Sequence, residues 1–169
     1  RSTNPDSYVW LERMAEKGWT VPNWPKEYGG ADLSKDEYMV LLEEMANINA
    51  RIPLHGMGVT MIGPTLLEFG TDEQKETYLR PLTEGTAWSC FAMTEPEVAG
   101  SDPTLIRTNG YQDGEEWVRN GHKWFISNAH RANFAILVAR TEDDPDLPQA
   151  ANTAFLIDLP TQGWNEVRQ

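Results

Sequence analysis

Long apolar runs, positive charge and cysteine are all scarce in this chain of 169 residues. No stretch approaches the ~20 consecutive apolar residues that a membrane-spanning helix needs, so we expect no membrane span, and we expect no signal peptide. Lysine and arginine total 14 against 26 acidic residues, which gives a net charge of −12. Because a nucleic-acid-binding protein needs a basic face that displaces counterions from phosphates, that class is excluded.

The single cysteine, Cys90, excludes a disulfide framework within the chain and favours a reducing compartment. Cys90 lies in an apolar run, so we interpret it as a small buried hydrophobe rather than a nucleophile. The histidines His55, His122 and His130 are scattered. No H-x-x-x-H or C-x-x-C pair occurs, and no metal site is predicted.

The first half of the chain has helical periodicity. The pattern predicts helices over residues 7–17, 34–48, 57–69 and 71–79. Ser34 with Glu37, and Thr71 with Gln74, have the spacing of capping boxes that begin two of these helices, and Pro64 bends or restarts a third. Residues 18–30 contain two prolines and three glycines and are predicted to be a loop whose aromatic residues pin it to the core.

The second half changes to strand-like patterns. Buried strands are predicted at 87–93, 134–139 and 153–157, with further candidates at 104–108 and 115–119. The pairs Asp113-Gly114 and Asn120-Gly121 are hairpin signals, and the second predicts a strand over 122–127. Helices first and strands second indicate an α+β protein, with an all-helical domain at 1–84 and a mostly antiparallel β domain at 85–169.

Two segments carry candidate chemistry. In residues 91–103, a strand leads into small and hydroxyl residues whose amides can form an anion-binding concavity, although an ordinary turn capped by Ser101 and Asp102 explains the same residues. Strand alternation in residues 120–129 places Phe125 and Ser127 on one face, where a ring and a hydroxyl can address one flat heteroaromatic ring. On this segment alone, a plain hairpin with a half-buried phenylalanine is the simpler interpretation.

Together these segments resemble the acyl-CoA dehydrogenase family. Residues 18–30 resemble its G-W-x-x-P-x-W-P-x-E-Y-G-G stretch, and residues 69–75 resemble its F-G-T-x-E-Q-K. Residues 94–102 resemble its T-E-P…G-S-D flavin loop, with one residue more than the commoner form, as in a subgroup of the family. Residues 120–128 resemble its N-G-x-K-x-x-I-[TS]-N motif. The resemblance covers nearly the whole chain.

The resemblance implies an FAD-dependent α,β-dehydrogenation, in which a carboxylate removes the α-proton of an acyl-CoA and the β-hydrogen leaves as hydride to the flavin. It assigns flavin contacts to Phe91, Met93, Thr94, Ser101, Phe125 and Ser127. Ser101 would reach the phosphate or the acyl-CoA chain, and Ser127 would lie near the flavin N5. No catalytic base is named, because the family's glutamate lies in a C-terminal helical domain expected beyond residue 169. Glu95 and Glu97 are interpreted as turn residues rather than bases.

The same resemblance implies an acyl-CoA substrate, an electron-transfer flavoprotein or similar acceptor, and a homodimer or homotetramer. The expected location is the bacterial cytoplasm, or the mitochondrial or peroxisomal matrix of a eukaryote. Acyl-CoA oxidases and flavin monooxygenases of the same fold are alternatives, because these residues do not reveal what reoxidises the flavin. A further alternative is a truncated, non-catalytic module, and we expect the 169-residue chain alone to be colourless and inactive.

Overall fold

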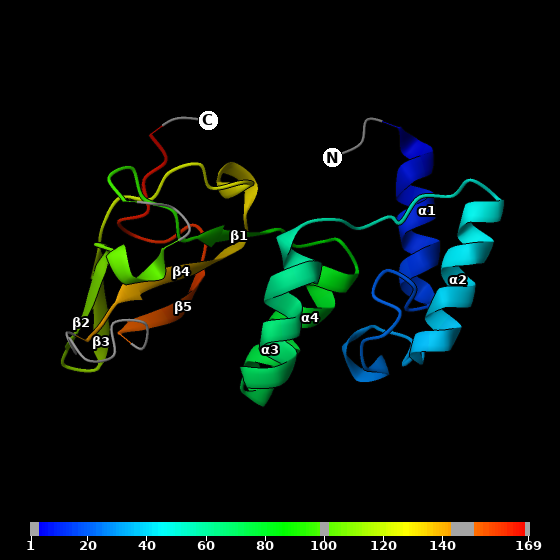
Figure 1. The fold of residues 1–169 in the computed structure, drawn as a ribbon, viewed down its shortest axis with the longest axis horizontal. Helices are drawn as coiled ribbons and strands as arrows, with labels where there is room; N and C mark the ends of the chain where they lie inside the picture. The colour runs from blue at the N-terminus through cyan, green and yellow to red at the C-terminus, as the bar shows by residue number, and fades with distance from the viewer. Residues whose placement is uncertain (1–3, 99–101, 143–150, 168–169) are drawn as a thin grey trace. The chain divides into compact units, whose positions relative to one another are not determined.

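The computed structural model describes residues 4–98, 102–142 and 151–167. The chain forms two compact units, Arg1–Ala87 and Trp88–Gln169. The first unit is helical and the second contains a five-stranded sheet (Figure 1). The α+β class, with helices before strands, is therefore confirmed.

Four α-helices make up most of the first unit: α1 (Pro5–Glu16), α2 (Lys35–Asn47), α3 (Gly63–Phe69) and α4 (Asp72–Thr83). Both capping boxes are confirmed. The hydroxyls of Ser34 and Thr71 each accept a hydrogen bond from the amide three residues later, and their own amides donate to the side chains of Glu37 and Gln74. A π-helical turn over Gly58–Ile62 precedes α3, so the chain changes its helical geometry just before Pro64.

The core of this unit forms around Trp24, whose side chain is 4% exposed. A Cβ atom added to Gly63 would lie 1.8 Å from Trp24 Cη2, so only glycine leaves room for the indole ring there. The 18–30 loop is thus fixed to the core by its aromatic residue, as the sequence predicts. Helix α4 continues to Thr83, past the predicted end at residue 79. Burial of Leu79 and Leu82 favours this extension despite Pro81 in the last turn.

The sheet of the second unit is built on its most buried strand, β4. The strands are β1 (Ser89–Ala92), β2 (Asn109–Asp113), β3 (Glu116–Asn120), β4 (Phe134–Arg140) and β5 (Asn152–Asp158). Strand β4 pairs antiparallel with β5 along its whole length and parallel with β1. Strand β2 pairs antiparallel with β3 and meets β4 only where Asn109 lies opposite Arg140. Antiparallel pairing therefore predominates.

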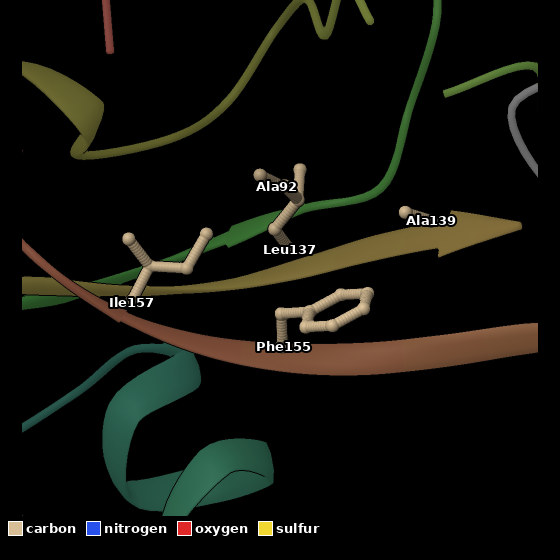
Figure 2. Close-up of a cluster of buried hydrophobic side chains, with 5 residues drawn as sticks. All are labelled: Ala92, Leu137, Ala139, Phe155 and Ile157. Carbon is tan, nitrogen blue, oxygen red and sulfur yellow. The ribbon is translucent and has the colours of Figure 1, made fainter. Parts of the chain in front are cut away.

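Five buried side chains from three strands form a hydrophobic cluster in this unit (Figure 2). Ala92 comes from β1, Leu137 and Ala139 from β4, and Phe155 and Ile157 from β5. Ile126, Leu159 and Trp164 pack against the cluster from outside the strands. The apolar runs that predicted buried strands therefore form the core of the sheet.

Two strand predictions in this unit are wrong. Asp113-Gly114 does connect β2 and β3, with Gly114 at φ +64°, but Asn120-Gly121 forms no second hairpin, and residues 122–127 are not a strand. A Cβ on Gly121 would lie 2.2 Å from Thr108 Oγ1, so this glycine allows a close approach to another segment. Residues 104–108 also form no strand, because the Asp102 side chain begins a 3-10 turn at Pro103–Leu105.

Candidate functional site

Two segments with candidate chemistry lie side by side in the second unit. We call residues 93–98, which follow β1, the β1 loop, and residues 121–128, which follow β3, the β3 segment. The backbone amide of Trp124 donates a hydrogen bond of 3.0 Å to the carbonyl oxygen of Thr94. Lys123 Nζ donates one of 2.9 Å to the carbonyl oxygen of Met93. The structure therefore joins the ends of two elements that are some thirty residues apart in the sequence.

A buried ion pair lies at this junction. Lys123 Nζ is 2.8 Å from Glu95 Oε1, and the two side chains are only 9% and 5% exposed. The same carboxylate accepts hydrogen bonds of 2.8 Å from the amides of Arg107 and Thr108. Burial opposes ionisation of Glu95, but these hydrogen bonds and Lys123 outweigh it and lower its pKa from 4.5 to about 2. Glu95 is therefore a buried anion at neutral pH.

Thr108 connects the Glu95 side chain to the sheet. The carbonyl oxygen of Thr108 accepts a hydrogen bond of 2.7 Å from the amide of Arg140, the last residue of β4. Glu95 is therefore held by a segment that is itself held by the central strand. The interpretation of Glu95 as a turn residue is wrong. Glu97 does lie in a turn, where it is exposed and pairs with the Arg107 side chain.

Phe125 has an unusual position for an aromatic residue. Its side chain is 83% exposed, and its backbone is left-handed, with φ +53°. Such a conformation is costly for a bulky residue and persists only where neighbouring contacts enforce it. Trp124, which is 40% exposed, lies against the Phe125 ring with centroids 4.6 Å apart. The alternative of a plain hairpin with a half-buried phenylalanine is therefore wrong.

The two segments also carry two hydroxyl side chains, those of Thr94 and Ser127. Thr94 is half-buried and Ser127 is exposed. Neither hydroxyl has a hydrogen-bond partner within residues 4–98, 102–142 and 151–167, so both are available to a ligand. Met93 is half-buried at the start of the β1 loop, and Phe91 is half-buried within β1. Ser101 lies outside the described residues.

The buried ion pair is the feature that sequence reasoning missed. Its members are 28 residues apart. Other glutamate and lysine residues of the chain are exposed, so residue type alone does not reveal that these two are buried. The available signal was the position of Lys123, a lone cation followed directly by Trp124, Phe125 and Ile126. A charge in such an apolar stretch needs a partner if it is buried.

Other candidate chemistry is absent or suppressed. Cys90 is 1% exposed, and burial, with a smaller contribution from Glu166, raises the pKa of its thiol to about 11. The interpretation of Cys90 as a buried hydrophobe is confirmed. Within the part of the chain that the structure describes, no three His, Cys, Asp or Glu side chains gather as metal ligands. None of the helices described is both long enough and apolar enough to cross a bilayer.

Comparison with known protein families shows which family the chain belongs to. The family model of the acyl-CoA dehydrogenase N-terminal domain matches residues 2–86, and that of the acyl-CoA dehydrogenase middle domain matches residues 90–168. The chain belongs to the acyl-CoA dehydrogenase family. The predicted resemblance is thus confirmed, and each matched range lies within one of the two units of this acyl-CoA dehydrogenase chain.

Individual relatives agree with this assignment. Acyl-CoA dehydrogenase IpdE1 of Mycobacterium tuberculosis is 37% identical over 134 residues, which are 79% of this chain and 34% of the relative. The mitochondrial short-chain specific acyl-CoA dehydrogenase of Bos taurus is 34% identical over 155 residues, or 90% of this chain and 37% of the relative. The chain therefore spans little more than a third of the length of these relatives.

A solved structure shows the same fold. The glutaryl-CoA dehydrogenase of Mycobacterium smegmatis, determined in complex with FADH2, superimposes with a TM-score of 0.69 at 26% sequence identity. The match covers 94% of this chain and 39% of the glutaryl-CoA dehydrogenase. The arrangement of a helical unit followed by a sheet is therefore shared with this glutaryl-CoA dehydrogenase.

Proposed function

We propose that this chain supplies flavin and substrate contacts to an enzyme that uses FAD to dehydrogenate an acyl-CoA thioester between its α and β carbons. Family membership and the FADH2 complex of the glutaryl-CoA dehydrogenase support the reaction class. The observation that carries the proposal is Phe125, whose ring is exposed and whose backbone is left-handed, in a segment that is hydrogen-bonded to Thr94 through the amide of Trp124.

The residues present fit an isoalloxazine ring. That ring is flat, with apolar faces and a rim of nitrogen and oxygen atoms, so it needs an aromatic or aliphatic surface together with nearby hydrogen-bond donors. Phe125 offers the surface, and the hydroxyls of Thr94 and Ser127 offer the donors. A ring stacked on Phe125 would shield this exposed side chain from water.

Each of these residues has a distinct proposed role. A flavin held by these residues would supply the hydride acceptor of the reaction. Phe125 covers the ring and excludes water from it, and the Ser127 hydroxyl donates to the ring edge near N5. Thr94 and Met93 would supply hydroxyl or backbone contacts to the ring. Each neutral hydrogen bond contributes about 0.5–1.5 kcal/mol, so these contacts orient the flavin more than they bind it.

Further contacts and partners complete the proposal. Phe91 packs near the flavin, and Ser101 contacts the phosphate or the acyl-CoA chain. No residue of this chain is assigned as the base, so we propose that the α-proton is removed by a carboxylate that these 169 residues do not supply. An electron-transfer flavoprotein or similar protein accepts the electrons, and the full-length enzyme is a homo-oligomer in the bacterial cytoplasm or an organelle matrix.

The test compares Phe125→Ala and Ser127→Ala with the wild type in the full-length protein, by titration with FAD and by the rate of flavin reduction. Loss of the ring should weaken FAD binding by about 2- to 12-fold, since aromatic contacts contribute about 0.5–1.5 kcal/mol. Both substituted side chains are exposed, so the free energy of unfolding should not change. Unchanged binding and reduction in both variants would show that the site is misassigned.

Two controls sharpen this test. Tyr111→Ala removes an exposed ring from β2 and should leave FAD binding unchanged. The 169-residue chain alone should purify colourless and should not oxidise any acyl-CoA. A yellow preparation with stoichiometric FAD and turnover would contradict the proposed division of the site.

A further inference from the structure

The ion pair between Glu95 and Lys123 has no role in the contacts proposed above. Both side chains are almost fully buried. Removing two charges from water is so costly that a buried ion pair adds little net stability compared with apolar residues of similar size. The presence of a charged pair at this place, instead of two apolar residues, therefore calls for an explanation other than stability, and its position suggests one.

The pair connects three segments at one point. Lys123, in the β3 segment, contacts Glu95 and the Met93 carbonyl oxygen, both in the β1 loop. The Glu95 carboxylate also accepts the amides of Arg107 and Thr108. The three connected segments are therefore the β1 loop, the β3 segment and residues 107–108.

The residues next to the pair are those proposed to face the flavin. Thr94 precedes Glu95, and Phe125 follows Lys123 by two positions. Between them, the Trp124 amide donates to the Thr94 carbonyl oxygen at 3.0 Å. A shift of either charged side chain would therefore move both groups relative to each other.

We propose that Glu95 and Lys123 are positioning residues, which hold the β1 loop and the β3 segment together and so fix the placement of Phe125 relative to Thr94. The consequence for flavin binding rests on the function proposed above, but the joining of the two segments does not. Neither residue touches the reacting atoms. Their effect passes through the backbone of the residues beside them.

The contacts predict how the pair responds to substitution. In Glu95→Gln/Lys123→Met, no buried charge is left without a partner, so the sheet should fold while the connection is lost. The charge-reversed variant Glu95→Lys/Lys123→Glu should not restore it, because an ammonium group at position 95 cannot accept the two amides. Glu97→Gln is the matched control, since Glu97 forms an exposed ion pair with Arg107.

Amide hydrogen exchange, followed residue by residue in the 169-residue chain without FAD, tests the connection. In the double variant, exchange at Trp124 should accelerate by about tenfold or more, which corresponds to about 1.4 kcal/mol. In the same double variant, exchange at Ile136, in β4, should stay within about twofold of the wild type. In the Glu97→Gln control, exchange at both Trp124 and Ile136 should stay within the same limit. Unchanged protection of Trp124 in the double variant, or full restoration by charge reversal, would overturn the proposal.

FAD titration and the visible flavin spectrum of the full-length protein then test the consequence. The double variant should bind FAD more weakly and alter the shape of the flavin absorption band, while Glu97→Gln should do neither. An unaltered band and affinity in a double variant with lost Trp124 protection would contradict the positioning role. If the wild type itself binds no FAD, the proposed function is wrong, whereas the exchange measurements still decide whether the pair joins the two segments.

Discussion

Acidification should expose the contribution of Glu95 to stability. The pKa of this carboxyl group is about 2 in the folded chain and 4.5 when unperturbed, so the folded state favours the ionised form. The resulting stabilisation is fully present above pH 4.5 and is lost as the pH falls from there towards 2. Each pKa unit corresponds to about 1.36 kcal/mol, so the full contribution is about 3 kcal/mol.

The assay is urea unfolding of the wild type and Glu95→Gln at pH 7 and at pH 3. At pH 3 the unfolded chain has bound its proton at position 95 and the folded chain mostly has not, so about 2 kcal/mol of the contribution is gone. Other carboxylates also titrate in this range, and the difference between the two proteins removes their effect. The wild type should therefore exceed the variant by at least about 3 kcal/mol at pH 7, and this difference should shrink by about 2 kcal/mol at pH 3.

Glu97→Gln provides the control, because its exposed ion pair should contribute less than about 1 kcal/mol at either pH. A difference between wild type and Glu95→Gln that is equal at pH 7 and pH 3 would refute the reasoning. It would mean that Glu95 binds its proton equally in the folded and unfolded chain, and that its hydrogen bonds to Lys123 and the two amides do not favour the ionised form.

Three other predictions concern stability and reactivity. Ser34→Ala should lower the free energy of unfolding by about 1 kcal/mol in urea, because α2 loses its N-terminal cap; an unchanged value would mean that the capping bond is not formed. Gly63→Ala should destabilise by about 1–3 kcal/mol and alter tryptophan fluorescence, because the new methyl group would overlap Trp24; wild-type values of both would disprove that packing. At pH 8, Cys90 should react with a thiol reagent at least about 100-fold more slowly in the native chain than in urea, and equal rates would show that it is accessible.

Local signals were enough to predict much of the fold. The capping boxes at Ser34 and Thr71 were predicted correctly because every atom involved lies within four residues. The apolar runs of β4 and β5 and the Asp113-Gly114 turn were predicted from residues that are contiguous in the sequence. The Asn120-Gly121 prediction failed because a turn signal forms a hairpin only if the following residues pair with the preceding strand. Contacts with distant segments determine the path of those residues instead.

The candidate site was predictable only as a set of residues. Family motifs indicated Thr94, Phe125 and Ser127, but motif and spacing carry no information on exposure or on a left-handed backbone. The burial of Glu95 depends on Lys123, far along the chain, and on two backbone amides. No local pattern distinguishes this glutamate from an exposed one, so its role emerged only from the three-dimensional arrangement.

The left-handed backbone at Phe125 makes selection for stability and selection for ligand binding favour different residues at this position. Glycine adopts this conformation without steric cost, so laboratory evolution for thermal tolerance alone should drift from phenylalanine towards glycine or asparagine at this position. Alanine would lose the ring without gaining that relief, and a β-branched side chain would be the least tolerated substitute. Persistence of an aromatic residue at position 125 under such drift would signal that a ligand, rather than the folded chain itself, maintains it.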